Sequence, residues 1–165
     1  MKKVIIFGGT GFIGTSVAKY ISSKGFYPIV IGRTKTNESF EFVKWDGMNA
    51  GEWEGELNNA FAIINLVGKS VDCIKTPKNI DEILKSRVDA TLLIGKALRK
   101  ANSPPKIWIQ MSTAHIYGDS ETRINHEDST LGYGLAPFVG KKWEAAFHAS
   151  ALSDTRKVLL RTGFV

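Results

Sequence analysis

The sequence predicts a doubly wound α/β domain, in which helices cover both faces of a parallel sheet. Short β-branched runs alternate along the whole chain with longer segments of helical period. The runs are almost continuously apolar, which is typical of strands covered on both faces. With 165 residues, the chain is long enough for one such domain, spanning residues 1–165, and it contains no internal repeat or linker.

Each element follows from its local pattern. Strands are predicted where apolar or β-branched residues run together, at Lys3–Phe7, Tyr27–Ile31, Phe40–Trp45, Ala60–Leu66, Lys106–Met111 and Lys157–Arg161. Helices are predicted where apolar residues recur with a period near 3.6, at Phe12–Lys24, Asn79–Ala101 and Ala136–Leu152. Strands that alternate with helices in this way require right-handed crossovers, and so form a parallel, three-layer α/β/α sandwich.

Composition excludes several classes of protein. Hydrophobic residues make up 43% and charged residues 23% of the chain, which is typical of a globular protein, and no apolar run is long enough to span a membrane. The single cysteine, Cys73, rules out an internal disulfide and favours a cytoplasmic protein. The net charge of +6 is spread out rather than concentrated in a stripe, which argues against nucleic acid as a partner. No histidine has the spacing of a metal ligand.

A glycine-rich segment follows the first strand and opens the first helix. Its glycines satisfy both G-x-G-x-x-G, with Gly9 at the first position, and G-x-x-G-x-x-G. Glycines permit a tight turn and let backbone amides approach a pyrophosphate at the helix N-terminus. The pattern therefore predicts a Rossmann-type dinucleotide site, with a merely tight strand–helix turn as the alternative. The residues expected at the phosphates are Gly8, Thr10, Gly11, Phe12, Ile13 and Gly14.

The end of the second strand indicates which cofactor binds. An acidic residue there would mark NAD, but the strand ends with Gly32 and Arg33, and the first carboxylate is Glu38. A guanidinium matches a phosphate through two parallel hydrogen bonds, so Arg33 favours the 2′-phosphate of NADP(H). The alternative is that Arg33 is a solvated loop charge.

Two further strand ends are expected at the cofactor, because ligands of open α/β sheets bind outside the carboxyl ends of the strands. Asp46 closes the third strand, where it can meet the adenine amino group or, alternatively, cap the following turn. Small residues close the fourth strand and are expected to pass beneath the cofactor: Asn65, Leu66, Val67 and Gly68.

The segments GGTGFIG, INLVG, STAHIYG and LLRTG together resemble the extended short-chain dehydrogenase/reductases. The closer match is to atypical members called epimerase family, or nucleoside-diphosphate-sugar epimerase, proteins. That match rests on Trp45-Asp46, Ser86-Arg87-Val88 with Thr91, Trp143-Glu144-Ala145-Ala146 and Leu160-Arg161-Thr162-Gly163. The resemblance implies an NADP-binding core followed by a smaller substrate lobe. Since the chain stops at Val165, we expect most of that lobe to lie outside this sequence.

The resemblance also implies the catalytic residues. Thr113 matches the family's substrate-positioning hydroxyl and Ser112 stands beside it, whereas Ala136 and Gly140 occupy the positions of the family's Tyr-x-x-x-Lys pair. A substitute acid is therefore needed, and Tyr117 is the first candidate, although its alternative role is to pack beneath the loop.

Arg87 replaces an asparagine that supports the catalytic group in ordinary family members. It is expected to contact phosphate or nicotinamide ribose, with Glu82 as its orienting partner; two solvated helical charges are the alternative.

The sequence thus predicts a cytoplasmic NADP(H)-binding oxidoreductase or sugar-nucleotide epimerase-like protein that transfers hydride at a carbinol or carbonyl. Its expected partner is a small-molecule substrate such as a nucleotide sugar, and the family resemblance implies a homodimer. The missing Tyr-x-x-x-Lys pair leaves two alternatives, a non-catalytic NADP(H)-sensing regulator and an inactive cofactor-binding fragment.

Overall fold

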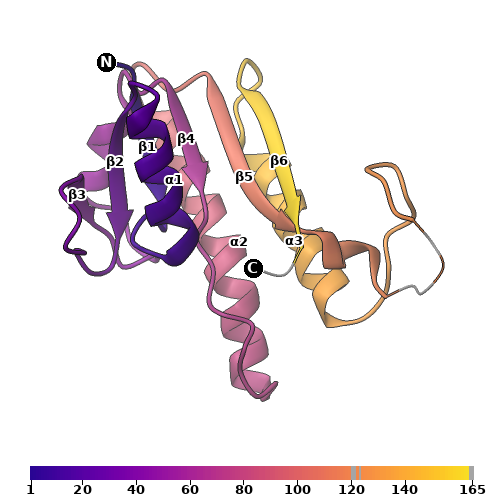
Figure 1. Ribbon diagram of the computed structural model, residues 1–165. Coiled ribbons are helices and arrows are strands. Elements are labelled where there is room, and N and C mark those ends of the chain that lie inside the picture. Colours follow the sequence, from indigo (N-terminus) through magenta and orange to yellow (C-terminus); the bar gives the residue numbers. More distant parts are fainter. Residues whose placement is uncertain (120–121, 123, 164–165) are drawn as a thin grey trace.

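The computed structural model describes residues 1–119, 122 and 124–163, so that the chain end at Val165 lies outside the described residues. It confirms the predicted doubly wound sheet, which has six parallel strands in the order β3-β2-β1-β4-β5-β6 (Figure 1). The strands are β1 Lys3–Phe7, β2 Tyr27–Gly32, β3 Glu41–Lys44, β4 Ala62–Asn65, β5 Ile107–Thr113 and β6 Arg156–Thr162. Strand order reverses between β1 and β4, which in open α/β sheets is where ligands bind.

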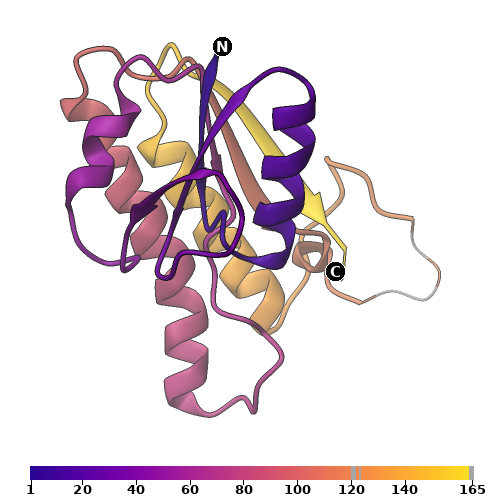
Figure 2. The same ribbon diagram turned by 60° about the vertical axis from the view of Figure 1, so that its left-hand side comes forward.

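Three α-helices flank the sheet: α1 Phe12–Ser23, α2 Pro77–Lys100 and α3 Leu135–Ser150. Helix α1 lies on one face, and α2 and α3 pack side by side on the other (Figures 1 and 2). The N-terminal part of α2 projects beyond the carboxyl ends of the strands, together with the loop that precedes it (Figure 1). This projection brings charged residues of α2 to the edge of the sheet where the site is expected.

Alternate residues of β1 feed two separate hydrophobic clusters, because successive side chains of a strand point to opposite faces. Ile5 and Phe7 pack toward α2 and α3, whereas Val4 and Ile6 pack toward α1. Both clusters consist of apolar side chains that are shielded from water. Burial of their apolar surface therefore stabilises the packing of the helices on the sheet. On the α1 side of the outermost strand, β6, the large apolar residue Leu160 stays 42% exposed.

Two elements are absent from the sequence-based prediction, the 3₁₀ helices η1 (Glu52–Leu57) and η2 (Ala114–Tyr117). Otherwise the predicted strands and helices agree with the structure to within two residues at each end. None of the helices in the described part of the chain has the length and apolar character needed to cross a membrane.

Candidate functional site

The carboxyl ends of β1, β2 and β4 meet at the predicted phosphate loop. The backbone amide of Gly8 donates to the carbonyl of Ile31 at 2.9 Å, and the amide of Leu66 donates to the carbonyl of Phe7 at 2.9 Å. Gly8 has a φ of +73°, and a Cβ there would lie 3.1 Å from the carbonyl carbon and oxygen of Leu66. The loop therefore rests directly on the segment after β4, and glycine is needed both for backbone conformation and for space.

Close backbone packing also requires glycine at two further positions of the loop, Gly9 and Gly14. A Cβ on Gly14 would lie 2.5 Å from the Gly8 carbonyl oxygen and 2.5 Å from the Cα of Gly9, and a Cβ on Gly9 would lie 2.8 Å from the Ile6 oxygen. Helix α1 begins at Phe12 without a side-chain cap and without an acidic residue in its first turn. Its N-terminal partial positive charge is thus left uncompensated within the helix, as an anion site requires.

The end of β2 carries the predicted selector of the 2′-phosphate. A Cβ on Gly32 would lie 2.5 Å from the hydroxyl oxygen of Thr10, so that only glycine fits between β2 and the phosphate loop. Arg33 follows and is exposed, whereas Glu38 is paired with Lys19 at 2.7 Å. The first carboxylate after β2 is therefore neutralised, and the guanidinium is accessible at the strand end.

Asp46, at the end of β3, caps the turn that follows it. Its carboxylate accepts hydrogen bonds from the backbone amides of Met48 and Asn49, at 2.8 and 2.9 Å, and from the Asn49 side chain at 2.7 Å. The indole nitrogens of Trp45 and Trp53 both donate to the Asn49 carbonyl, at 2.7 and 3.1 Å. The turn-capping alternative is thus confirmed, and a contact between Asp46 and adenine stays a prediction.

These bonds give a testable pH dependence. The hydrogen bond from the Asn49 side chain, followed by those from the backbone amides, lowers the pKa of Asp46 below its ordinary 3.8. Stabilisation by the carboxylate is therefore present above pH 3.8 and is lost as the pH falls through the lowered pKa. We expect Asp46→Ala to unfold at a lower temperature than the parent at pH 7, and this difference to shrink in acid. A difference that grew below pH 3.8 would contradict the assignment.

Asn65, the last residue of β4, organises a buried polar network. Its amide nitrogen donates to the Thr91 hydroxyl at 3.2 Å and to the Gln110 side-chain oxygen at 3.1 Å, and its oxygen accepts from the Val67 amide at 3.1 Å. The indole of Trp143 also donates to the Thr91 hydroxyl, at 3.2 Å. The network ties β4, β5, α2 and α3 together, so that the backbone of residues 66–68 has a fixed position beneath the predicted cofactor.

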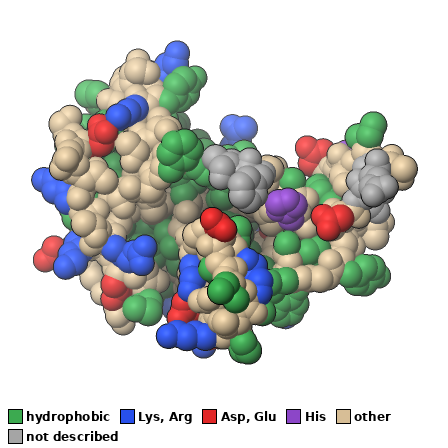
Figure 3. Space-filling model, turned by 60° about the horizontal axis from the view of Figure 1, so that its bottom comes forward, with side chains coloured by type: hydrophobic (Ala, Val, Ile, Leu, Met, Phe, Trp, Pro, Cys, Tyr) green, Lys and Arg blue, Asp and Glu red, His purple; other side chains and the backbone are tan. Residues whose placement is uncertain are grey.

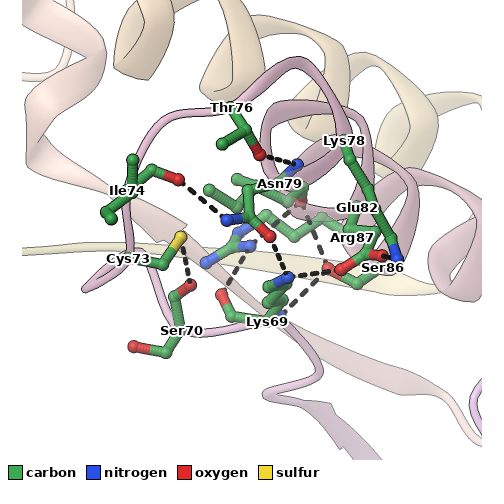
Figure 4. A network of polar contacts seen from close by, with 11 residues as sticks. Lys69, Ser70, Cys73, Ile74, Thr76, Lys78, Asn79, Glu82, Ser86 and Arg87 are labelled. Atoms are coloured by element: carbon green, nitrogen blue, oxygen red, sulfur yellow. Dashed lines mark hydrogen bonds and ion pairs between the residues drawn. The ribbon is translucent and has the colours of Figure 1, made fainter.

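The predicted pairing of Glu82 with Arg87 is wrong. Figure 4 shows that the Glu82 carboxylate instead meets the ammonium of Lys69, which also donates to Asn79 at 2.8 Å. The hydrogen bond from Lys69 lowers the pKa of Glu82. Helical residues three or four apart are neighbours, but five apart they diverge around the helix, so that Glu82 and Arg87 face different partners.

Arg87 is held by backbone carbonyls. Its Nη1 atom donates to the carbonyls of Lys69 and Ile83, both at 3.0 Å, and its guanidinium lies 5.1 Å from the ring centre of Trp143. The hydroxyl of Ser86 accepts from the amide of Lys69 at 2.9 Å (Figure 4). Helix α2 therefore binds both the amide and the carbonyl of Lys69, in the loop that follows β4. Burial lowers the pKa of Arg87.

The residues predicted for catalysis divide between two environments. Ser112 is buried, and its hydroxyl donates to Glu144 at 2.6 Å. Tyr117 is also buried, and its hydroxyl lies 2.5 Å from Nη1 of Arg161. Thr113 is half-buried, and its hydroxyl oxygen accepts from the amide of His115 at 3.2 Å. Thr113 is therefore the accessible member of the three.

A partly buried ion pair, not foreseen from the sequence, holds this region together: the Glu144 side chain is 9% exposed and that of Arg161 20%. Arg161 donates from Nε and Nη2 to the two carboxylate oxygens of Glu144, at 2.9 and 2.8 Å, and from Nη1 to the Glu127 carbonyl at 2.9 Å. The only available signal was a glutamate on the inner face of a helix together with an arginine in an otherwise apolar strand. The pair joins α3 to β6, and through Ser112 and Tyr117 it also fixes the end of β5 and η2.

The face formed by the carboxyl ends of the strands carries both signs of charge. Figure 3 shows Lys and Arg side chains interspersed with Asp and Glu, without one continuous basic stripe on the face in view. Among the described residues, no group of three or more His, Cys, Asp and Glu side chains could hold a metal ion.

Comparison with known proteins agrees with this geometry. Residues 4–161 match the model of the NAD dependent epimerase/dehydratase family. The epimerase family protein SDR39U1 of Homo sapiens is 31% identical over 99% of this chain and 54% of its own length, and the epimerase family protein YfhF of Bacillus subtilis is 32% identical over 94% and 52%. The chain thus spans about half the length of the curated relatives it matches.

Solved structures show the same fold. The human SDR39U1 structure with NADPH superposes with a TM-score of 0.83 at 29% identity, over 96% of this chain and 52% of the other. A structure of a protein from Burkholderia cenocepacia, described as a putative epimerase, gives a TM-score of 0.82 at 16% identity, over 98% and 54%. The second likeness, at this low identity, shows the fold alone.

Proposed function

The chain belongs to the NAD dependent epimerase/dehydratase family, and from that premise we propose that it binds NADP(H) across the carboxyl ends of β1, β2 and β4. The observation that carries the proposal is the cradle in which Cβ atoms at Gly9, Gly14 and Gly32 would collide with neighbouring atoms. Such a cradle brings bare backbone to the N-terminus of α1, where a pyrophosphate is bound best. NADPH in the human SDR39U1 structure supports this choice of cofactor.

Residues around the cradle are assigned by their positions. The loop from Gly8 to Gly14 would receive the pyrophosphate, Arg33 the 2′-phosphate, and Asp46 the adenine. The segment from Asn65 to Gly68 would lie under the nicotinamide half, since it follows the strand next to β1 in the direction of β5. Each assignment uses a group that the structure holds at the same edge of the sheet.

Replacing Arg33 with alanine tests the preference for NADP(H). A charged hydrogen bond to the 2′-phosphate contributes enough that its loss should weaken NADPH binding about 10- to 150-fold. NADH, which lacks that phosphate, should bind the variant and the parent equally. The measurement is a fluorescence titration of each protein with both cofactors.

Arg156→Ala is the matched control, because it removes the same exposed charge at the opposite, amino end of the sheet, where β6 begins. It should leave NADPH affinity unchanged. If Arg33→Ala lowered the affinities for NADH and NADPH by the same factor, the guanidinium would not bind the 2′-phosphate.

We further propose reversible hydride transfer at a carbinol or carbonyl. Bound NADP(H) supplies or accepts the hydride. Thr113 would hold the reacting oxygen: its hydroxyl oxygen already accepts from His115, and no other partner for it occurs in the described part of the chain, so its proton is left to donate. Ser112 and Tyr117 are buried against Glu144 and Arg161 and would act by positioning, unless Tyr117 serves as the acid.

A non-catalytic NADP(H)-sensing role is the second candidate, and one observation favours it. Ala136 and Gly140 stand where related enzymes carry an acid/base tyrosine and its lysine, and a Cβ at Gly140 would already lie 3.1 Å from Ile116. NADPH oxidation against nucleotide sugars and small carbonyl compounds separates the two roles. Turnover supports the enzyme, and tight binding without turnover supports the sensor or an inactive fragment.

A further inference from the structure

Arg87 lies just past the carboxyl edge of the sheet. It stands one helical turn before Thr91, whose hydroxyl accepts a hydrogen bond from Asn65 at the end of β4. A turn of α-helix rises about 5.4 Å, which places Arg87 outside the strand ends, beside the loop that follows β4. It is therefore within the same region as the proposed nicotinamide half of the site.

The guanidinium is fixed in orientation. A Cβ on Gly68 would lie 3.0 Å from Cζ of Arg87 and 3.1 and 3.3 Å from its Nη2 and Nε atoms, and the Trp143 ring centre lies 5.1 Å from the same Cζ. Both hydrogens of Nη1 are used by the carbonyls of Lys69 and Ile83. Gly68 and Trp143 thus bracket a guanidinium whose remaining edge, Nε and Nη2, makes no hydrogen bond to any described residue.

Arg87 has no counter-ion among the described residues. Within residues 1–119, 122 and 124–163, no carboxylate forms an ion pair with Arg87, although the neighbouring Lys69 has Glu82. In Arg161 the same two atoms of the guanidinium, Nε and Nη2, donate to the two carboxylate oxygens of Glu144. Burying a cation without a counter-charge is unfavourable, so a partner from outside the chain would relieve this cost.

The position of Arg87 favours the substrate over the cofactor's phosphates. The pyrophosphate is proposed at the loop after β1 and the 2′-phosphate at the end of β2, whereas Arg87 contacts the loop after β4 and helix α3, on the side of β5. The free edge presents two parallel donors in one plane, which match a carboxylate or a phosphate, and both phosphate groups of the cofactor are proposed at other strand ends. Thr113, the proposed anchor of the reacting oxygen, ends the neighbouring strand β5.

Building on the proposed function, we infer that Arg87 binds a carboxylate of the substrate, so that the reacting carbinol or carbonyl belongs to a carboxylate-bearing molecule. Its role is one of binding and orientation. Lysine cannot replace it fully, because an ammonium is a point charge that lacks the two-donor edge.

The test uses lactate, which carries a carbinol beside a carboxylate, and lactamide, its neutral counterpart. Both are titrated into ¹⁵N-labelled protein saturated with NADP⁺, and the Nε–H signal of Arg87 and the indole N–H signal of Trp143 are followed by NMR. Lactate should move both signals, whereas lactamide and sodium chloride at equal ionic strength should not. In Arg87→Gln, lactate affinity should fall about tenfold or more, and in Arg87→Lys by a smaller factor.

Two variants separate binding from structure. Gly68→Ala keeps the charge of Arg87 but displaces its guanidinium, since the new Cβ would lie 3.0 Å from Cζ, and should weaken lactate as well. Arg99→Gln, which removes an arginine from the other end of the same helix, should bind lactate like the parent. An equal response to lactamide, or an undiminished response in Arg87→Gln, would overturn the inference.

NADP⁺ affinity is measured separately in every protein. If Arg87→Gln weakened NADP⁺ and lactate had no effect on the parent, Arg87 would hold the cofactor, and the inference would fail while the proposed function stood. If the parent bound no NADP⁺, the proposed function would fail on its own, and lactate titrated without cofactor would still decide whether Arg87 is an anion site.

Discussion

Glu144→Ala should lower the free energy of unfolding by at most about 3–5 kcal/mol, the cost of removing one partner from a fully buried ion pair, since the Arg161 side chain is 20% exposed. The variant leaves Arg161 inside the protein without the two carboxylate oxygens that its Nε and Nη2 atoms hold, and it also leaves the Ser112 hydroxyl without an acceptor. The Glu144 side chain is only 9% exposed, so water cannot replace the lost carboxylate without a rearrangement. Urea unfolding followed by tryptophan fluorescence measures the loss.

Two comparisons identify the cause. Asp81→Ala breaks an exposed ion pair with Lys85 on α2 and should leave the unfolding midpoint essentially unchanged. The double variant Glu144→Leu/Arg161→Met removes both charges and should recover much of the stability lost in Glu144→Ala, because no uncompensated charge stays buried. A double variant less stable than the single one would show that packing, rather than charge, dominates.

Gly14→Ala should weaken NADPH binding by on the order of 100-fold, because several charge-assisted hydrogen bonds would be lost together. The new Cβ would lie 2.5 Å from the Gly8 oxygen and from the Cα of Gly9, and both are backbone atoms that cannot swing aside. Either the loop or the N-terminus of α1 must move, at a cost in stability of about 1–3 kcal/mol. Calorimetric titration with NADPH and thermal unfolding measure the two effects.

The matched control is Gly55→Ala. Gly55 lies in η1 away from the loop, its φ is not positive, and a Cβ there meets no other atom within 4 Å. This variant should bind NADPH like the parent. Parental affinity in Gly14→Ala would instead show that the phosphate loop is not the binding site.

Much of the fold could be predicted because its elements have strong local patterns. Lys3–Phe7 is apolar after its first residue. In α2 the apolar residues recur with a helical period along more than six turns, which makes this helix easy to predict. Helices η1 and η2 were missed because a 3₁₀ helix of four to six residues is too short for any hydrophobic period to appear. Their positions depend on tertiary contacts: Trp53 and Leu57 of η1 are completely buried.

The geometry of the site could be predicted where spacing alone fixes it, as in the glycine loop, whereas the role of Arg33 at the 2′-phosphate stays a prediction. The geometry could not be predicted where partners come from distant segments. Glu82 has its partner in Lys69, 13 residues earlier, and Arg161 has its partner in Glu144 on another element. Ser112 and Thr113 follow each other in β5, yet only a strand's alternation, with α3 covering one face, buries the first and leaves the second half-exposed.

The shared Asn49 carbonyl has a consequence for how a ligand is captured. Trp45 and Trp53 both bond to it, and both rings pack edge-on against Phe7, the last residue before the phosphate loop. The cluster of Phe7, Trp45 and Trp53 thus supports both the turn after β3 and the phosphate loop after β1. A dinucleotide reaching this end would meet two loops with a shared aromatic support, so we expect its association rate to depend mainly on diffusion and long-range charge attraction.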